Sequence, residues 1–137
     1  MNQMNQTIDK LAWMKIENGR QLVVRSRGKD KFYNPGGKRE QGESDIDALA
    51  RELREELNIE IIPKTVKLFG VYAAQADGKP AGVMVQITAY TADFRGVPTP
   101  GGEIEEIAWI DTSDAHRLSA IHIEKILPDL VRRGLIN

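Results

Sequence analysis

The sequence predicts an α/β domain in which a β-sheet lies between helices, and three observations lead to this prediction. The 137 residues are enough for one domain with a sizeable core. Short apolar or alternating runs, typical of strands, occupy much of residues 11–110. One helical pattern lies early, at about residues 44–58, and another lies late, at about 119–133. Such an arrangement favours a sheet covered by helices.

Two strands around a tight turn open the domain, within residues 11–27. Asn18 and Gly19 form the pair that two-residue hairpin turns prefer, because both positions tolerate positive φ. The apolar run at 22–24 predicts a strand that is buried on both faces. Glycine, proline and asparagine then cluster in residues 28–37, which indicates a loop.

The early helix is predicted to begin at Ser44, whose hydroxyl can cap the free N–H groups, with Asp47 three residues on. Asn58 is a plausible end, since asparagine tolerates the left-handed conformation. Apolar residues at helical spacing predict one buried stripe. The stripe consists of Ile46, Leu49, Ala50, Leu53 and Leu57.

Further strands are expected at residues 59–62, 66–76, 83–93 and 107–110. The loop DGKPAG joins the second and third of them as a hairpin, and RGVPTPGGE precedes the last. The late helix contains Pro128, which should kink or split it.

The composition excludes several classes of function. The chain has no cysteine, two histidines and a net charge of -1, which argues against thiolate chemistry, a histidine-rich metal site and nucleic-acid binding. It has no apolar run of membrane-spanning length, so no membrane partner is expected. We expect one domain over 1–137, with residues 1–8 a flexible start, and a cytoplasmic location because the polar start does not look like a signal peptide.

Three glutamates crowd one side of the early helix. Glu52, Glu55 and Glu56 repel each other, and a bound cation would reverse that effect. Oxygen ligands favour Mg²⁺, with Mn²⁺ as an alternative. A solvated helix face is the competing interpretation of these three residues taken alone.

The residues around the helix extend the pattern. Gly36 and Gly37 allow the backbone to approach a ligand, and Glu43 lies just before the helix. Arg51 precedes Glu55 by one turn and can hold its carboxylate.

The full spacing resembles the Nudix box, G-x5-E-x7-R-E-U-x-E-E-x-G-U, in which U is bulky and apolar. The matching residues are Gly37, Glu43, Arg51, Glu52, Leu53, Glu55, Glu56 and Ile59. Asn58 replaces the usual glycine, and asparagine is well tolerated at positive φ. The resemblance implies an α/β/α sandwich around a mixed sheet and hydrolysis of a diphosphate linked to another group, usually a nucleoside.

Roles follow from the resemblance, residue by residue. Gly37 would offer its carbonyl to a metal, and Glu55 and Glu56 would be core ligands. Glu52 would be a ligand or the base that deprotonates water, oriented by Arg51. Glu43 would be a further ligand.

The catalytic base can also come from outside the box. Residues Glu103, Glu105 and Glu106 in GGEIEEIAW are the available acids, and we favour Glu103 or Glu105 because Glu106 directly precedes the apolar run at 107–110.

Substrate contacts are predicted from the loop before the box. Arg25 and Arg27 alternate along a strand and can bind phosphate, as can Lys38. Tyr33 can stack on a base, as can Trp13, Phe32 and Tyr72, although core packing explains each of these aromatic residues better. Asn34 can bind a base edge, although turn formation explains it equally well.

The resemblance leaves the substrate open. ADP-ribose enzymes often carry a proline at the position where Ala74 stands, and diadenosine polyphosphate enzymes a tyrosine slightly further on, where residues 75–77 contain none. A nucleoside triphosphate, oxidised or not, is therefore favoured, with cleavage to monophosphate and pyrophosphate. Alternatives are another diphosphate such as a nucleotide sugar, and a catalytically silent domain that binds a nucleotide or protein. Nudix enzymes are often dimers, so a homodimer is possible.

Overall fold

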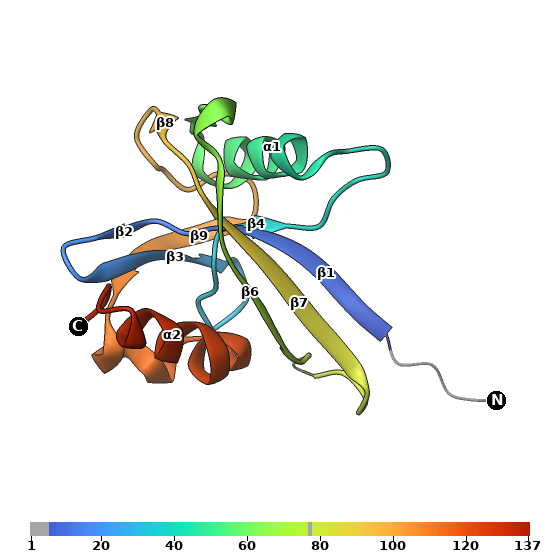
Figure 1. Cartoon of the computed structure of the whole chain (residues 1–137), viewed down its shortest axis with the longest axis vertical. Coiled ribbons are helices and arrows are strands. Elements are labelled where there is room, and N and C mark those ends of the chain that lie inside the picture. The colour runs from blue at the N-terminus through green and yellow to red at the C-terminus, as the bar shows by residue number, and fades with distance from the viewer. Residues whose placement is uncertain (1–5, 77) are drawn as a thin grey trace.

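The computed structural model describes residues 6–76 and 78–137 and confirms the α/β/α sandwich around a mixed sheet (Figure 1). The strands are β1 Gln6–Trp13, β2 Ile16–Glu17, β3 Arg20–Ser26, β4 Gly36–Gly37, β5 Glu60–Ile61, β6 Lys67–Gln75, β7 Val83–Thr91, β8 Phe94–Arg95 and β9 Ile104–Ile110. The helices are α1 Asp45–Leu57 and α2 Leu127–Arg132, with a π-helical turn at His122–Ile126 and 3₁₀ turns at Pro63–Thr65 and Thr112–Arg117.

The sheets are organised around β1. It pairs in parallel with β7 and antiparallel with the short β4, and the four-stranded order is β4-β1-β7-β6. A second sheet has the order β2-β3-β9, and β5 pairs with β8. The β1–β4 pairing fixes the glycine loop against the central strand, because Gly36 lies opposite Ala12 and Gly37 opposite Leu11.

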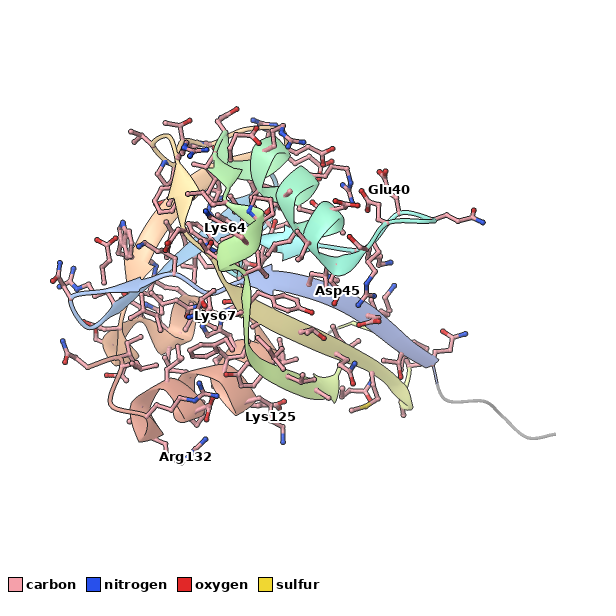
Figure 2. All side chains as sticks on the ribbon, turned by 45° about the horizontal axis from the view of Figure 1, so that its top comes forward. Glu40, Asp45, Lys64, Lys67, Lys125 and Arg132 are labelled. Atoms are coloured by element: carbon pink, nitrogen blue, oxygen red, sulfur yellow. The ribbon has the colours of Figure 1, made fainter. Side chains whose placement is uncertain are left out.

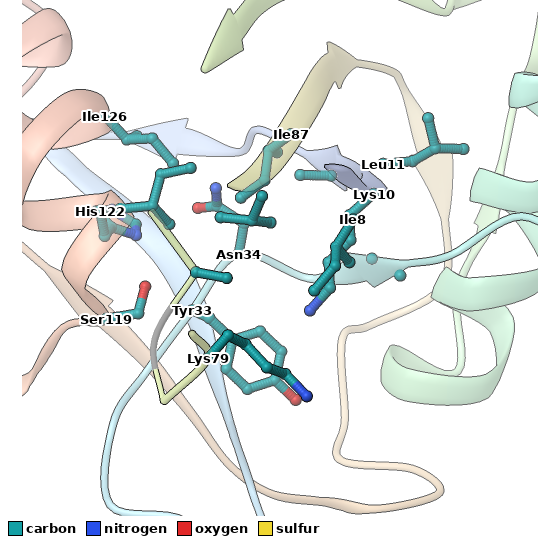
Figure 3. Close-up of a pocket in the computed structure, with 16 residues that line it drawn as sticks. Ile8, Lys10, Leu11, Tyr33, Asn34, Lys79, Ile87, Ser119, His122 and Ile126 are labelled. Carbon is teal, nitrogen blue, oxygen red and sulfur yellow. The ribbon is translucent and has the colours of Figure 1, made fainter. Parts of the chain in front are cut away.

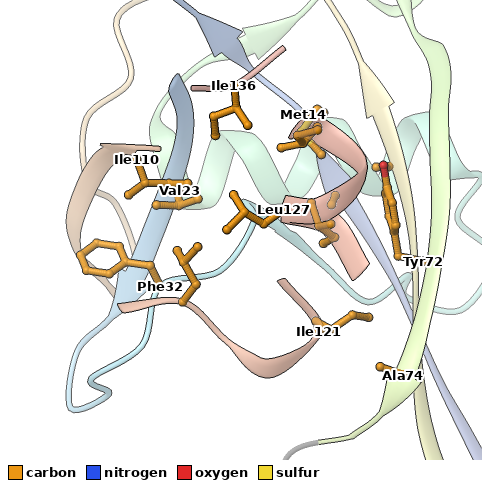
Figure 4. Close-up of a cluster of buried hydrophobic side chains, with 14 residues drawn as sticks. Met14, Val23, Phe32, Tyr72, Ala74, Ile110, Ile121, Leu127 and Ile136 are labelled. Carbon is orange, nitrogen blue, oxygen red and sulfur yellow. The ribbon is translucent and has the colours of Figure 1, made fainter. Parts of the chain in front are cut away.

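Two apolar cores lie on opposite faces of the strands. Neighbouring strand residues point to opposite faces, so Leu22 and Val24 pack with α1 whereas Val23 packs under α2. This confirms that the strand at 22–24 is buried on both sides. Figure 4 shows the α2-side core, with Val23 near Ile110 and Leu127.

Both predicted ends of α1 are confirmed. The Ser44 hydroxyl accepts a hydrogen bond from the Asp47 N–H at 3.1 Å. Asn58 adopts φ 58° at the C-cap, and its side chain donates to the Thr99 carbonyl at 3.1 Å. The predicted stripe is wrong at Ile46 in the first turn of α1, which is 38% exposed, whereas Leu49, Leu53 and Leu57 are fully buried.

The late helix carries a change of register, which agrees with the expected disruption at Pro128. A π-helical turn at His122–Ile126 precedes the α-helical turns of α2, and Pro128 lies in the first turn of α2. The wider turn accommodates a residue that has no N–H to donate.

The N-terminal prediction needs correction. Residues 6–8 belong to β1, where Gln6, Thr7 and Ile8 pair with Val83, Met84 and Val85. Their backbone groups join the β7 ladder, a long-range pairing that local polarity does not reveal. Residues 1–5 lie outside the described part of the chain. At the next turn Asn18 and Gly19 have φ 54° and 74°, which confirms the hairpin.

Candidate active site

The acidic face of α1 lies directly against the glycine loop. The Glu56 carboxylate accepts a hydrogen bond from the Gly36 N–H at 2.9 Å. A Cβ placed on Gly37 would come within 2.3 Å of the Glu52 Oε2 atom, so only glycine allows this approach. The loop and the helix therefore form one site, as their spacing in the sequence predicted.

Burial raises the proton affinity of this acidic face. The pKa of Glu56 is raised to about 8, mainly by burial, with Glu52 and Glu55 adding to the effect and the Gly36 N–H opposing it. Burial also raises the pKa of Glu52, and Arg51 opposes that increase. In the metal-free protein Glu56 therefore holds a proton at neutral pH, and a bound cation would favour its ionised form.

Arg51 orders the acidic residues around it. Its Nε and Nη2 atoms donate to the two Glu43 oxygens at 2.7 and 2.9 Å, and Nη1 lies 3.2 Å from Glu55 Oε1. The same Nη1 is 3.4 Å from Glu52, and Nη2 donates to the Lys38 carbonyl. The hydrogen bonds from Arg51 lower the pKa of Glu43 to about 2. The predicted Arg51–Glu55 pair exists, but the paired contact with Glu43 is the tighter one.

The donors of this site fit a hard divalent cation. All are carboxylate or backbone oxygens, and Gly37 leaves space beside Glu52 that a side chain would fill. Among residues 6–76 and 78–137, however, no three acidic or histidine side chains already stand as a coordinating group. Ion binding would therefore have to draw some of these carboxylates together.

The loop before β9 brings one further acid towards this site. The Gly101 N–H donates to the Glu56 carbonyl and the Thr99 N–H to the Leu57 carbonyl, both at 2.9 Å. These bonds satisfy the last turn of α1 and dock the loop on it. Glu103 follows this docked segment. Burial is the main cause of the raised pKa of the Tyr33 hydroxyl, and the charges of Glu56, Glu103 and Glu52 raise that pKa further.

Glu105 and Glu106 have a different environment. The guanidinium group of Arg25 lies 3.1 Å from a Glu106 oxygen and 3.5 Å from a Glu105 oxygen. Arg25 is therefore engaged on β9. Arg27 lies beyond the end of β3, and its N–H donates to the Glu103 carbonyl at 2.7 Å. The predicted alternation of the two arginines along one strand is wrong, because a β-bulge at Arg25–Ser26 interrupts it.

A cavity of about 300 Å³ adjoins the glycine loop (Figure 3). The predicted residues Tyr33 and Asn34 line it together with Gly36 and Gly37, and apolar side chains of β1, β7 and the late helix form the rest of its wall. The other candidate aromatic residues, Trp13, Phe32 and Tyr72, are buried in the cores.

Lys10 joins the cavity to the acidic face, and the sequence did not reveal it. Burial lowers the pKa of the Lys10 amine, and the charge of Lys38 lowers it further. The nearby carboxylates of Glu56 and Glu52 oppose this shift because they favour the charged amine. Figure 3 shows the amines of Lys10 and Lys79 together with the Tyr33 hydroxyl at one end of the cavity.

Charged side chains lie on both helical layers. Figure 2 shows Glu40 and Asp45 beside the start of α1, whereas Lys125 and Arg132 lie on the opposite helical layer. The described residues include no helix that is long and apolar enough to cross a membrane.

The two adjacent glycines make a test of the loop. Gly37→Ala is expected to lower kcat by about tenfold and leave stability nearly unchanged, because its Cβ meets only the flexible end of Glu52. Gly36→Ala is expected to lower the free energy of unfolding by about 2–4 kcal/mol, because its Cβ meets the Leu11 carbonyl at 2.1 Å and its φ is 142°. Urea unfolding and steady-state rates of both variants check this, and similar effects of the two would contradict it.

Comparison with known proteins shows to which family the chain belongs. A family model described as the NUDIX domain matches residues 11–130. A protein of Methanocaldococcus jannaschii described as "ADP-ribose pyrophosphatase" is 31% identical over 121 residues, which cover 85% of this chain and 69% of that protein.

Solved structures agree on the fold. The E. coli ORF135 protein superimposes with a TM-score of 0.66 and 26% identity, covering 94% of this chain and 92% of its own. A MutT protein from Methanosarcina mazei gives a TM-score of 0.74 at 18% identity, covering 97% and 99%.

The protein is therefore an enzyme of diphosphate hydrolysis, the class that both the fold and the family define. The chain belongs to the Nudix family of hydrolases, which generally use a divalent metal and act on small nucleotide diphosphates.

Proposed function

We propose that this Nudix hydrolase cleaves nucleoside triphosphates, including oxidised ones, to monophosphate and pyrophosphate with the help of Mg²⁺ or Mn²⁺. The observation that carries the proposal is the continuity of the cavity with the acidic face through Gly36, Gly37 and Lys10. A base in the cavity would leave the phosphates over α1. The cavity has room for one such group beside the loop.

Each residue has a role in this proposal. The cation is held by Glu52, Glu55, Glu56 and the Gly37 carbonyl. The paired hydrogen bonds between Arg51 and Glu43 fix the loop against the helix. The cation would neutralise the diphosphate and lower the pKa of a water molecule. Lys10, Lys38 and Lys79 balance the phosphate charge, and Glu103 accepts the proton from water.

ADP-ribose is a second candidate substrate, and a specific observation favours it. The relative from Methanocaldococcus jannaschii is described as an ADP-ribose pyrophosphatase. Cleavage of ADP-ribose would need the same metal and carboxylates, but the second product would be a sugar phosphate instead of pyrophosphate.

A substrate panel decides between these proposals. The expected result is release of pyrophosphate from at least one nucleoside triphosphate with Mg²⁺ and none with EDTA. Faster cleavage of ADP-ribose than of every triphosphate would favour the second candidate. The absence of turnover on all diphosphates, including nucleotide sugars, would indicate a silent binding domain and sink both.

A further inference from the structure

A polar cluster made of Gln21, Asn34 and His122 lies at the inner end of the cavity. The side chains of Gln21 and His122 are fully buried, and Asn34 is 6% exposed. Such burial is costly for polar groups unless they are hydrogen-bonded. Asn34 and His122 line the cavity (Figure 3). Gln21 is not among the lining residues, and its side chain bridges the two through hydrogen bonds.

The hydrogen bonds fix the orientation of each group. The Gln21 Nε2 atom donates to Asn34 Oδ1 at 2.6 Å and to the Met14 sulfur at 3.1 Å. The Gln21 Oε1 atom must then accept, so the proton of the His122 ring lies on Nε2, 2.7 Å away. A reversed Gln21 amide would place its oxygen against the Met14 sulfur, where it finds no donor.

Two atoms of the cluster remain without a hydrogen-bond partner among residues 6–76 and 78–137. They are Asn34 Nδ2, which is a donor, and His122 Nδ1, which is an acceptor in this tautomer. An unsatisfied buried polar group costs about 1–3 kcal/mol, so both atoms favour a ligand that satisfies them. Burial also lowers the pKa of His122 to about 4, which keeps the ring neutral at physiological pH.

We infer that Gln21, Asn34 and His122 form a specificity-determining relay that reads the polar edge of the nucleobase. This inference rests on the function proposed above. The relay offers one donor and one acceptor, so it matches an edge that carries an acceptor and a donor side by side, as the pairing edges of nucleobases do. Phosphate, which offers acceptors alone, would leave His122 Nδ1 unsatisfied. The base therefore occupies the inner end of the cavity, and the phosphates lie at the end marked by Lys10 and Lys79.

Gln21 is a positioning residue in this relay, because it orients Asn34 and His122 through hydrogen bonds. Gln21→Met removes the bridge and leaves the lining of the cavity unchanged. We expect wild type to prefer its best base over the analogue without the exocyclic amino or keto group by about tenfold in kcat/KM, the effect of one to two hydrogen bonds. The preference should fall to about twofold in Gln21→Met.

Ser119→Ala is the matched control, since Ser119 lines the same cavity outside the relay. It should keep the tenfold preference. An unchanged preference in a folded Gln21→Met variant, or an equal loss in Ser119→Ala, would overturn the inference. Turnover of nucleotides with no dependence on the relay would refute the relay and leave the proposed function intact.

Nitrogen NMR of the wild-type protein tests the relay without turnover. The chain has two histidines, and His116 is exposed, so the ring of His122 is readily assigned. The free protein should show a neutral ring protonated at Nε2. The Nδ1 signal should shift when a nucleoside monophosphate binds and stay in place with ribose 5-phosphate. A shift with neither ligand, or an equal shift with both, contradicts base reading by the relay.

Discussion

Glu56→Gln is expected to abolish turnover, by about 10³-fold or more, and to leave the fold intact. Glu56 is the most deeply placed carboxylate of the site and its charge is needed to hold the cation. The glutamine oxygen can still accept from the Gly36 N–H, so the contact between loop and helix survives. Pyrophosphate release at saturating Mg²⁺ measures the loss. Turnover within tenfold of wild type would remove Glu56 from the proposed metal site.

The same variant should be more stable than the metal-free wild type at high pH. Unfolding shifts the pKa of Glu56 from about 8 to its ordinary value of 4.5. Between these values the folded protein holds a proton that the unfolded chain releases, so stability falls as pH rises through the window. Glutamine removes that dependence. At pH 8 we expect a gain of about 4 kcal/mol, and at pH 4 almost none.

Urea unfolding in EDTA at both pH values checks this expectation. Mg²⁺ should reduce the advantage of the variant, because it stabilises the ionised carboxylate of the wild type alone. An advantage that is equal at pH 4 and pH 8 would show that packing, rather than the charge of Glu56, limits the metal-free protein. The Glu56 carboxylate is thus needed for activity, although it lowers the stability of the metal-free protein at high pH.

The helical half of the site could be predicted because its geometry is local. Helix periodicity alone places Glu52, Glu55 and Glu56 on one side, and Ser44 and Asn58 mark the two ends of α1. The resemblance to the Nudix box implied that Gly37 and Glu52 serve one site, and in the structure the two residues lie side by side.

The cavity could not be predicted because long-range pairing builds it. Lys10 reaches the site only because β1 pairs in parallel with β7, far along the chain. Gln21 stands in β3 and its partner His122 is 101 residues away, so no local pattern joins them. Histidines are often only partly buried, whereas His122 is fully buried. Ile126 and Leu130 follow His122 by four and eight residues, so the three side chains share one helix face. This apolar spacing was the signal in the sequence that His122 is buried.

Glu103→Gln is expected to lower kcat by about 10²-fold, whereas Glu105→Gln should keep activity within about threefold. Both are exposed acids two residues apart, so they form a matched pair. Glu103 ends a loop that Gly101 docks on α1, and its charge acts on Tyr33 together with those of Glu56 and Glu52.

Glu105 stands on β9, where its carboxylate is already 3.5 Å from the Arg25 guanidinium group. If Glu103 accepts the proton from water, its loss lowers kcat with little change in KM, and the acidic limb of the pH–rate profile disappears. A loss in KM alone would assign Glu103 to substrate binding. Equal losses in both variants would instead indicate a general effect of negative charge at this edge of the site. The base would then have to be Glu52, which lies against Gly37.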